Sequence, residues 1–203
     1  LSLAKRKAKV NVVGLVGLVE NMPSSTAQRP GDIVKSMKGD TIEVINTDAE
    51  GRLVLSDLLW YAQKRFEPQG IIDLATLTGA IIVALGHENA GVFSNDDEFC
   101  NSFLKVANQE NEGAWRMPLG PNYDKKLKSR LADMKNVGGR DASAITAAQF
   151  IQRFIKKDMP WIHIDIAGAA HTKSESTYAP AGATGWGVMS LNQLVREKFE
   201  NNK

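Results

Sequence analysis

The chain has 203 residues, of which 43% are hydrophobic and 24% are charged. A chain of this size and balance can bury a hydrophobic core, so the composition excludes intrinsic disorder and favours one domain, which we place at residues 1–203. The formal net charge is +2, from 25 basic and 23 acidic residues, and this near balance argues against a nucleic acid or an anionic membrane as the partner.

The first residues, Leu1 to Lys7, resemble the last turns of a helix already under way. Because the chain also opens without a methionine, we expect a polypeptide truncated at its N-terminal side. No apolar run approaches the roughly 18 to 20 residues of a membrane span, no secretory signal is visible, and Cys100 has no second cysteine to pair with. These features predict a cytoplasmic protein.

Apolar patterning predicts strands that alternate with helices. Residues 10–19 form an almost unbroken apolar run, typical of a central parallel strand covered on both faces. A second strand is expected at residues 41–47, and a helix at residues 53–66, where apolar side chains recur every three or four positions. The later elements expected are strands at residues 71–77 and 161–167 and helices at residues 80–85, from Asp96 onward, 123–131, 145–157 and 188–199. The alternation predicts an α/β fold.

Most standard catalytic signatures are absent. The chain has no H-E-x-x-H, no phosphate-binding G-x-x-x-x-G-K, no G-x-S-x-G and no C-x-x-C. Its three histidines, His87, His163 and His171, lack metal-ligand spacing and are interpreted as hydrogen-bonded structural residues. Any metal bound by this chain must therefore use oxygen ligands.

The segment at residues 45–53 places two carboxylates and a guanidinium within five residues. Asp48 and Glu50, two apart on extended chain, would repel each other unless a divalent cation lay between them. Arg52 could hold a carboxylate, a carbonate or the oxyanion formed when water attacks a peptide carbonyl. The alternative is that the acidic residues only complement a helix dipole, by about 0.3 to 1 kcal/mol each. Local physics leaves both interpretations open.

The whole string Asn-Thr-Asp-Ala-Glu-Gly-Arg-Leu at residues 46–53 resembles the signature of the leucyl aminopeptidase family. Further matches occur in order along nearly the whole chain, at residues 20–23, 29–32, 74–80, 132–136, 163–168 and 182–185. The resemblance implies a three-layer α/β/α domain with a central, mostly parallel sheet, as a partial catalytic domain of that family.

The resemblance also implies roles for individual residues. Asp48 and Glu50 match metal ligands, with the glutamate bridging two divalent ions, either Mn²⁺ or Zn²⁺. Arg52 matches the catalytic arginine, thought to hold a bicarbonate that acts as general base.

Four further residues match substrate-binding positions of the family. Thr76, Leu77 and Gly79 fall where the family lines its substrate cleft, and Ala167 matches a residue beside the first specificity pocket. Simple close packing between a strand and a helix is the alternative for these small residues.

The implied activity is the metal-dependent release of N-terminal residues, with a leucine-type preference, from peptide substrates by a homo-hexamer. The family has two lysines and two further aspartates upstream of the first strand, and none of them is in this chain. We therefore expect the polypeptide alone to be inactive. The alternatives are a non-catalytic role or an accessory DNA-binding role of the parent protein, the latter disfavoured by the near-neutral charge.

Overall fold

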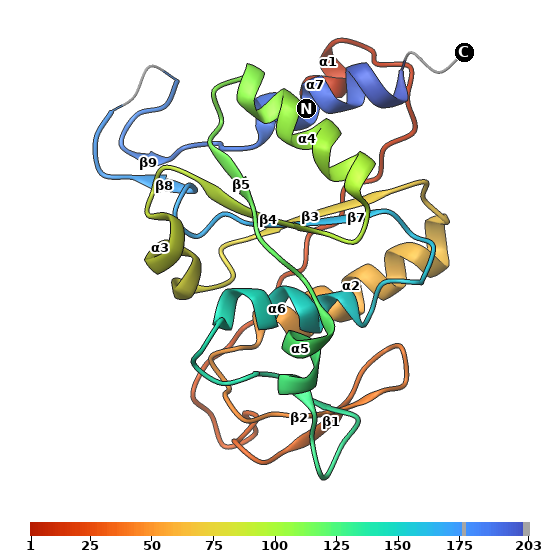
Figure 1. Cartoon of the computed structure of the whole chain (residues 1–203), viewed down its shortest axis with the longest axis vertical. Helices are drawn as coiled ribbons and strands as arrows, with labels where there is room; N and C mark the ends of the chain where they lie inside the picture. The colour runs from red at the N-terminus through yellow and green to blue at the C-terminus, as the bar shows by residue number, and fades with distance from the viewer. Residues whose placement is uncertain (176–177, 201–203) are drawn as a thin grey trace.

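The computed structural model describes residues 1–175 and 178–200, and it confirms the α/β fold. The predicted domain at residues 1–203 thus includes five positions, 176–177 and 201–203, that lie outside the described residues. Figure 1 shows a central sheet with helices on both faces, which gives the three layers expected. The sheet has the order β3 (Ile71–Ala75), β7 (Trp161–Asp165), β4 (Ala90–Ser94) and β5 (Ala114–Arg116). β3 pairs with β7 and β4 with β5 in parallel, whereas β4 and β7 are antiparallel.

Strand β7 lies in the middle of the sheet and is buried along its whole length. Its side chains alternate, so Ile162 and Ile164 join the core on one face while Trp161 joins the core on the other. His163 lies on the same face as Trp161, where its Nδ1 is 2.6 Å from the Oδ1 atom of Asp73. The Nδ1 atom of His163 is therefore paired, whereas its buried Nε2 atom has no hydrogen-bond partner among the described residues.

The helices form two layers around the sheet. The layer above it in Figure 1 contains α4 (Asp97–Gln109), α7 (Val188–Leu194) and the π-helical turn Val195–Phe199. The layer below contains α2 (Gly51–Phe66) and α6 (Ser143–Gln152), with α3 (Gly79–Leu85) beside them. The expected helices at residues 53–66 and 80–85 are confirmed. So is the N-cap of α4, because the Asp96 carboxylate accepts a hydrogen bond from the Phe99 N–H at 2.7 Å.

A second, smaller sheet carries the segment that leads into α2. It contains β1 (Ile33–Lys35), β2 (Thr41–Glu43) and β6 (Met134–Lys135), with β2 antiparallel to β1 and parallel to β6. The strand expected at residues 41–47 is thus only three residues long.

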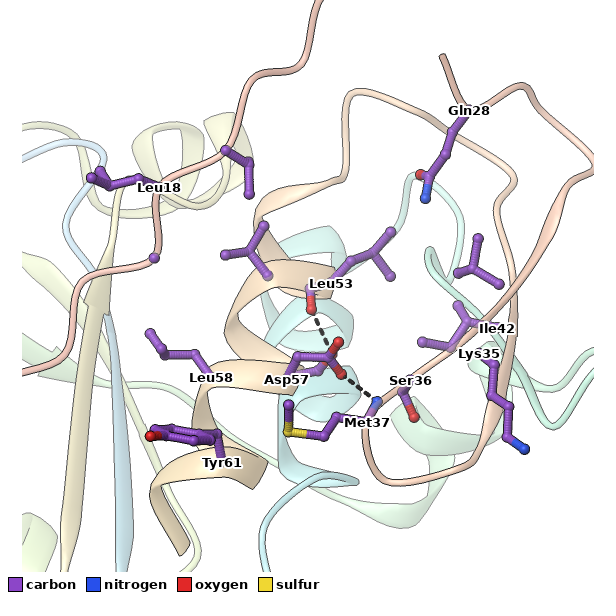
Figure 2. A pocket seen from close by; sticks show the side chains of 15 residues that line it. Leu18, Gln28, Lys35, Ser36, Met37, Ile42, Leu53, Asp57, Leu58 and Tyr61 are labelled. Carbon is purple, nitrogen blue, oxygen red and sulfur yellow. Dashed lines mark hydrogen bonds between the residues drawn. The ribbon is translucent and has the colours of Figure 1, made fainter. Parts of the chain in front are cut away.

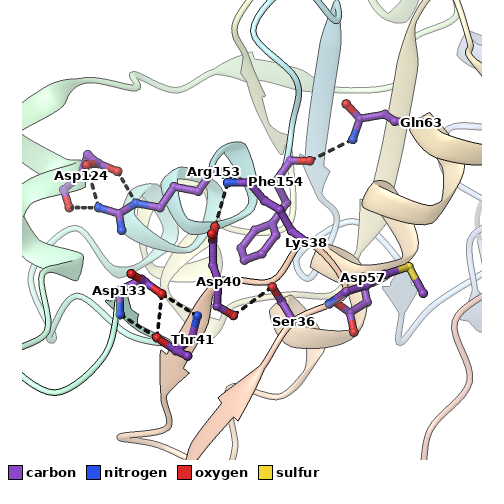
Figure 3. Close-up of polar contacts among 11 residues, drawn as sticks. Ser36, Lys38, Asp40, Thr41, Asp57, Gln63, Asp124, Asp133, Arg153 and Phe154 are labelled. Atoms are coloured by element: carbon purple, nitrogen blue, oxygen red, sulfur yellow. Dashed lines mark hydrogen bonds and ion pairs between the residues drawn. The ribbon is translucent and has the colours of Figure 1, made fainter.

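Side chains fasten this small sheet to the rest of the fold (Figure 3). Beside β6, Thr41 donates to Asp133 from its N–H at 2.8 Å and from its hydroxyl at 2.7 Å. Lys38 donates to Asp40 and to the carbonyl of Arg153, both at 2.8 Å. The hairpin between β1 and β2 is therefore anchored to the end of α6. The remaining elements are α1 (Ser2–Lys5), α5 (Pro121–Asp124), the 3₁₀ turn Lys125–Leu127, β8 (His171–Thr172) and β9 (Gly182–Ala183).

The expectation of a central strand at residues 10–19 is wrong. The segment is extended but unpaired, and among the described residues no backbone-to-backbone hydrogen bond involves residues 9–23. It runs against α2, where a Cβ on Gly17 would lie 2.7 Å from a methyl of Val54. A strand requires a neighbour, and no strand of the described sheets pairs with this run, so Val16 is 79% exposed and Leu18 86% exposed.

A cavity of about 490 Å³ lies between this extended segment, the β1–β2 hairpin and α2 (Figure 2). Leu18, Ile42 and Leu58 give it apolar walls, and Asp57 of α2 accepts a hydrogen bond from the Met37 N–H at its rim, at 2.8 Å. None of the site residues expected from the sequence lines it. In the part of the chain that is described, no helix has both the length and the apolar character needed to cross a membrane.

The exposure of residues 10–19 can be tested with one substitution made at two valines. Val16→Lys should change the free energy of unfolding by less than about 0.5 kcal/mol, because the side chain is already in water. Val92→Lys should abolish the cooperative unfolding transition, because Val92 is fully buried in β4 and would place a charge in the core. Urea denaturation followed by circular dichroism measures both. A loss of more than about 2 kcal/mol for Val16→Lys, the scale of core substitutions, would show a buried strand.

Candidate metal and substrate site

The two carboxylates singled out in the sequence lie in a short loop, residues 45–50, between β2 and α2. We call this segment the acidic loop. Asp48 is exposed and Glu50 is half-buried. Glu50 occupies the N-cap position of α2, yet its carboxylate makes no capping hydrogen bond and instead accepts one from the Asn21 side-chain amide at 2.9 Å. Glu50 is therefore not a hydrogen-bonded cap of α2, and its carboxylate is held by Asn21 instead.

Arg52 lies in the first turn of α2 and is 5% exposed. Its Nη1 donates to the carbonyl oxygen of Asn136 at 2.9 Å, while its Nε has no hydrogen-bond partner among the described residues. Burial lowers the pKa of Arg52 to about 10, against the opposing effects of Asp165 and Glu50, so the guanidinium stays charged at neutral pH. A buried cation with an unpaired N–H is suited to hold an anion that comes from outside the chain.

The expected substrate residues follow the ends of two parallel strands. Asp165, which ends β7 opposite Ala75 of β3, is 1% exposed. Its Oδ1 accepts hydrogen bonds from the Leu77 N–H at 3.0 Å and the Ala167 N–H at 3.3 Å, and its Oδ2 accepts one from the Thr78 hydroxyl at 2.6 Å. One buried carboxylate thus fixes both segments that the sequence proposed for substrate binding.

The four expected substrate residues differ in their exposure to solvent. Thr76 and Gly79 are exposed, and Leu77 and Ala167 are half-buried. The acidic loop lies next to them, because a Cβ on Gly51 would lie 3.4 Å from a methyl carbon of Leu77. The site residues therefore gather at the carboxyl ends of β3 and β7, the edge at which open α/β sheets bind ligands.

The strand before the acidic loop is β2, which belongs to the small sheet and not to the central one. The loop reaches the edge of the central sheet through α2 and its contact with Leu77.

Three residues of the site were not recognised from the sequence: Asn21, Asn136 and Asp165. All three lie inside segments that resemble the family, and Asp165 stood out as a charged residue in a buried strand. The signal was present, but the side-chain contacts join residues more than 25 positions apart along the chain.

The described residues do not contain a complete metal site. Among them, no three His, Cys, Asp or Glu side chains are grouped so as to hold an ion. Two of the histidines are hydrogen-bonded within the fold. His163 bonds the carboxylate of Asp73, and His87 bonds the carbonyl oxygen of Gly168 at 2.7 Å. Asp48 and Glu50 remain as two candidate carboxylate ligands, two positions apart in sequence.

Residues 1–192 match the model of the cytosol aminopeptidase family, catalytic domain. The chain is 70% identical over 199 residues to a probable cytosol aminopeptidase of Cereibacter sphaeroides, and 69% identical over 199 residues to one of Dinoroseobacter shibae. Each alignment covers 98% of this chain and 41% of the relative, so the chain spans about two fifths of the length of these curated relatives.

Two solved structures share the fold. A tomato leucine aminopeptidase mutant superposes with a TM-score of 0.81 at 45% identity, over 87% of this chain and 34% of that chain. The bottromycin maturation enzyme BotP, in complex with Mn, superposes with a TM-score of 0.82 at 38% identity, over 88% of this chain and 40% of that chain. The sequence match and the shared architecture agree, and the chain belongs to the catalytic domain of the cytosol aminopeptidase family.

Proposed function

We propose that this chain forms one wall of a two-metal aminopeptidase site that releases N-terminal residues, with a leucine-type preference, from peptides. The observation that carries the proposal is the buried Arg52, whose Nε lacks a partner among the described residues. It lies within five residues of Asp48 and Glu50, and Glu50 makes no capping hydrogen bond; Leu77 packs against the start of the same helix. Membership of the family and the Mn complex of BotP support a divalent metal.

In this proposal Asp48 and Glu50 hold the metals, which are Mn²⁺ or Zn²⁺. Carboxylate oxygens are ligands that both of these divalent ions accept. When bound, a pair of divalent cations lowers the pKa of water and polarises the peptide carbonyl. Asn21 contributes by fixing one oxygen of Glu50, which leaves the other oxygen of that carboxylate for a ligand.

Arg52 serves the reaction as a fixed positive charge. Its unpaired N–H fits a bicarbonate ion, or the oxyanion that develops on the substrate, through a charge-assisted hydrogen bond. Because Nη1 is already bonded to the Asn136 carbonyl, the guanidinium does not have to be ordered when the anion arrives.

The four remaining residues receive the substrate. The exposed Thr76 and Gly79 and the half-buried Leu77 border the acidic loop, and Ala167 lies beside them through Asp165. The small side chains of Thr76, Gly79 and Ala167 leave room for a peptide backbone.

Two carboxylates are too few donors for tight binding of two cations, each of which takes about four to six ligands. We therefore propose that the other ligands come from polypeptide outside these 203 residues, in a parent protein that acts in the cytoplasm as a homo-hexamer. The chain alone is then expected to be inactive. DNA binding gains no support, since the net charge is +2.

The metal assignment predicts a large effect of Glu50→Gln in the full-length parent polypeptide. With Mn²⁺ and leucine p-nitroanilide, kcat/KM should fall at least about 100-fold, or about 2.7 kcal/mol, because a neutral amide is a poor ligand. Glu67→Gln makes the same change at the exposed far end of α2 and should leave the rate unchanged. Equal rates for wild type and Glu50→Gln would refute the assignment. Release of p-nitroaniline by the 203-residue chain alone would instead contradict the proposal that the other ligands lie outside it.

The role of Arg52 predicts a response to bicarbonate. Arg52→Lys keeps the charge but loses the fork of N–H donors, so the rate should fall at least about tenfold and no longer rise with added bicarbonate. Arg65→Lys, at the exposed end of the same helix, is the matched control and should respond like the wild type. Bicarbonate titration of the initial rate is the measurement, and an undiminished response in Arg52→Lys would contradict the role.

A further inference from the structure

Asn136 has a fully buried side chain at the point where the small sheet ends. Strand β6 pairs in parallel with β2, through Ile42 with Met134 and Glu43 with Lys135. The backbone ladder continues for one more bond, from the Asn136 N–H to the Glu43 carbonyl oxygen at 3.0 Å. Beyond that bond the chain of β2 turns away into the acidic loop.

The side chain of Asn136 takes over where the backbone ladder stops. Its Oδ1 accepts hydrogen bonds from the Ile45 N–H at 2.8 Å and the Asn46 N–H at 3.4 Å. Its Nδ2 donates to the Asn46 carbonyl at 2.7 Å and to the Ala49 carbonyl at 3.4 Å. One planar amide therefore bonds four backbone groups at the two ends of the acidic loop.

Only an amide can do this from one short side chain, because it offers an acceptor and two donors together. An aspartate of the same shape would keep the acceptor but face the two carbonyl oxygens without a donor. An alanine would leave all four backbone groups without this partner, and a buried unpaired group costs about 1 to 3 kcal/mol.

The same residue also holds the guanidinium, since its carbonyl oxygen accepts the hydrogen bond from Arg52 Nη1 at 2.9 Å. The acidic loop and Arg52 are thus both bonded to Asn136, a residue that lies 84 or more positions later in the chain. We infer that Asn136 is a positioning residue, which fixes the acidic loop and Arg52 in the arrangement that binds metal and anion. Its consequence for metal binding rests on the proposed function.

The test uses the 203-residue chain and two readouts from nuclear magnetic resonance. The first is hydrogen exchange of the Ile45 and Asn46 amides relative to core amides of β7. The second is the broadening of the amide signals of residues 47–50 by Mn²⁺ alone, which detects weak binding. In Asn136→Ala, exchange at Ile45 and Asn46 should rise about 10- to 100-fold beyond any change in the core. The Mn²⁺ concentration for half-broadening should rise about tenfold.

Gln63→Ala is the matched control. Gln63 is also a fully buried amide, and at the far end of α2 it bonds the backbone of Leu59, Phe154 and Lys156 at 2.8 to 2.9 Å. Its loss should lower global stability without changing either local readout. If Gln63→Ala and Asn136→Ala alter exchange and Mn²⁺ broadening alike, Asn136 is merely structural and the inference fails.

Asn136→Asp covers the case in which the alanine variant does not fold. It should keep Ile45 and Asn46 protected, because the acceptor oxygen remains, while the signals of residues 47–50 shift. Unshifted signals would overturn the inference. Absence of Mn²⁺ broadening in the wild-type chain would contradict the proposed metal ligands, and hydrogen exchange would still decide whether Asn136 fixes the loop.

Discussion

The arrangement of the site depends on one buried charge, the carboxylate of Asp165 at the end of β7. A buried carboxylate is stable only when its oxygens are paired, and here they accept hydrogen bonds from the segments after β3 and after β7. The nearby Arg52 is itself buried, and Asp165 partly offsets the lowering of its pKa. Satisfying this carboxylate therefore fixes the segment before α3 against the end of β7, and the start of α2 meets that segment where Gly51 packs against Leu77.

Much of this fold was predictable, because the elements that cover the sheet have regular apolar patterns. The sequence of α2 has apolar residues every three or four positions, and Asp96 marks the N-cap of α4. The sequence of β7 is that of a buried strand interrupted by two polar residues. The candidate site was predictable in part, since Asp48, Glu50 and Arg52 are neighbours in sequence. The family resemblance suggested that they lie near Leu77 and Ala167. The hydrogen bond by which Asp165 fixes Leu77 joins residues 88 positions apart, so no local pattern shows it.

Other features could not be read from local patterns, because strand formation depends on partners. Residues 10–19 have a strand-like sequence, yet no strand of the described sheets pairs with them. Conversely, β4 lies within the sheet although no strand was expected at Ala90–Ser94. It contains Gly91, where an added Cβ would lie 2.3 Å from a methyl carbon of Ile81. Asn136 illustrates the same limit, since its sequence neighbourhood gives no sign that its amide bonds a loop about 90 positions earlier.

The account rests on the claim that Asp48 and Glu50 bind cations beside Arg52. The most direct measurement is a crystal structure of the full-length parent polypeptide grown in Mn²⁺, with the ions located by their anomalous scattering. The account predicts manganese within coordination distance of carboxylate oxygens of both residues, with an anion against the Nε atom of Arg52. Manganese bound elsewhere, with Asp48 in solvent and Glu50 bonded only to protein groups, would contradict it.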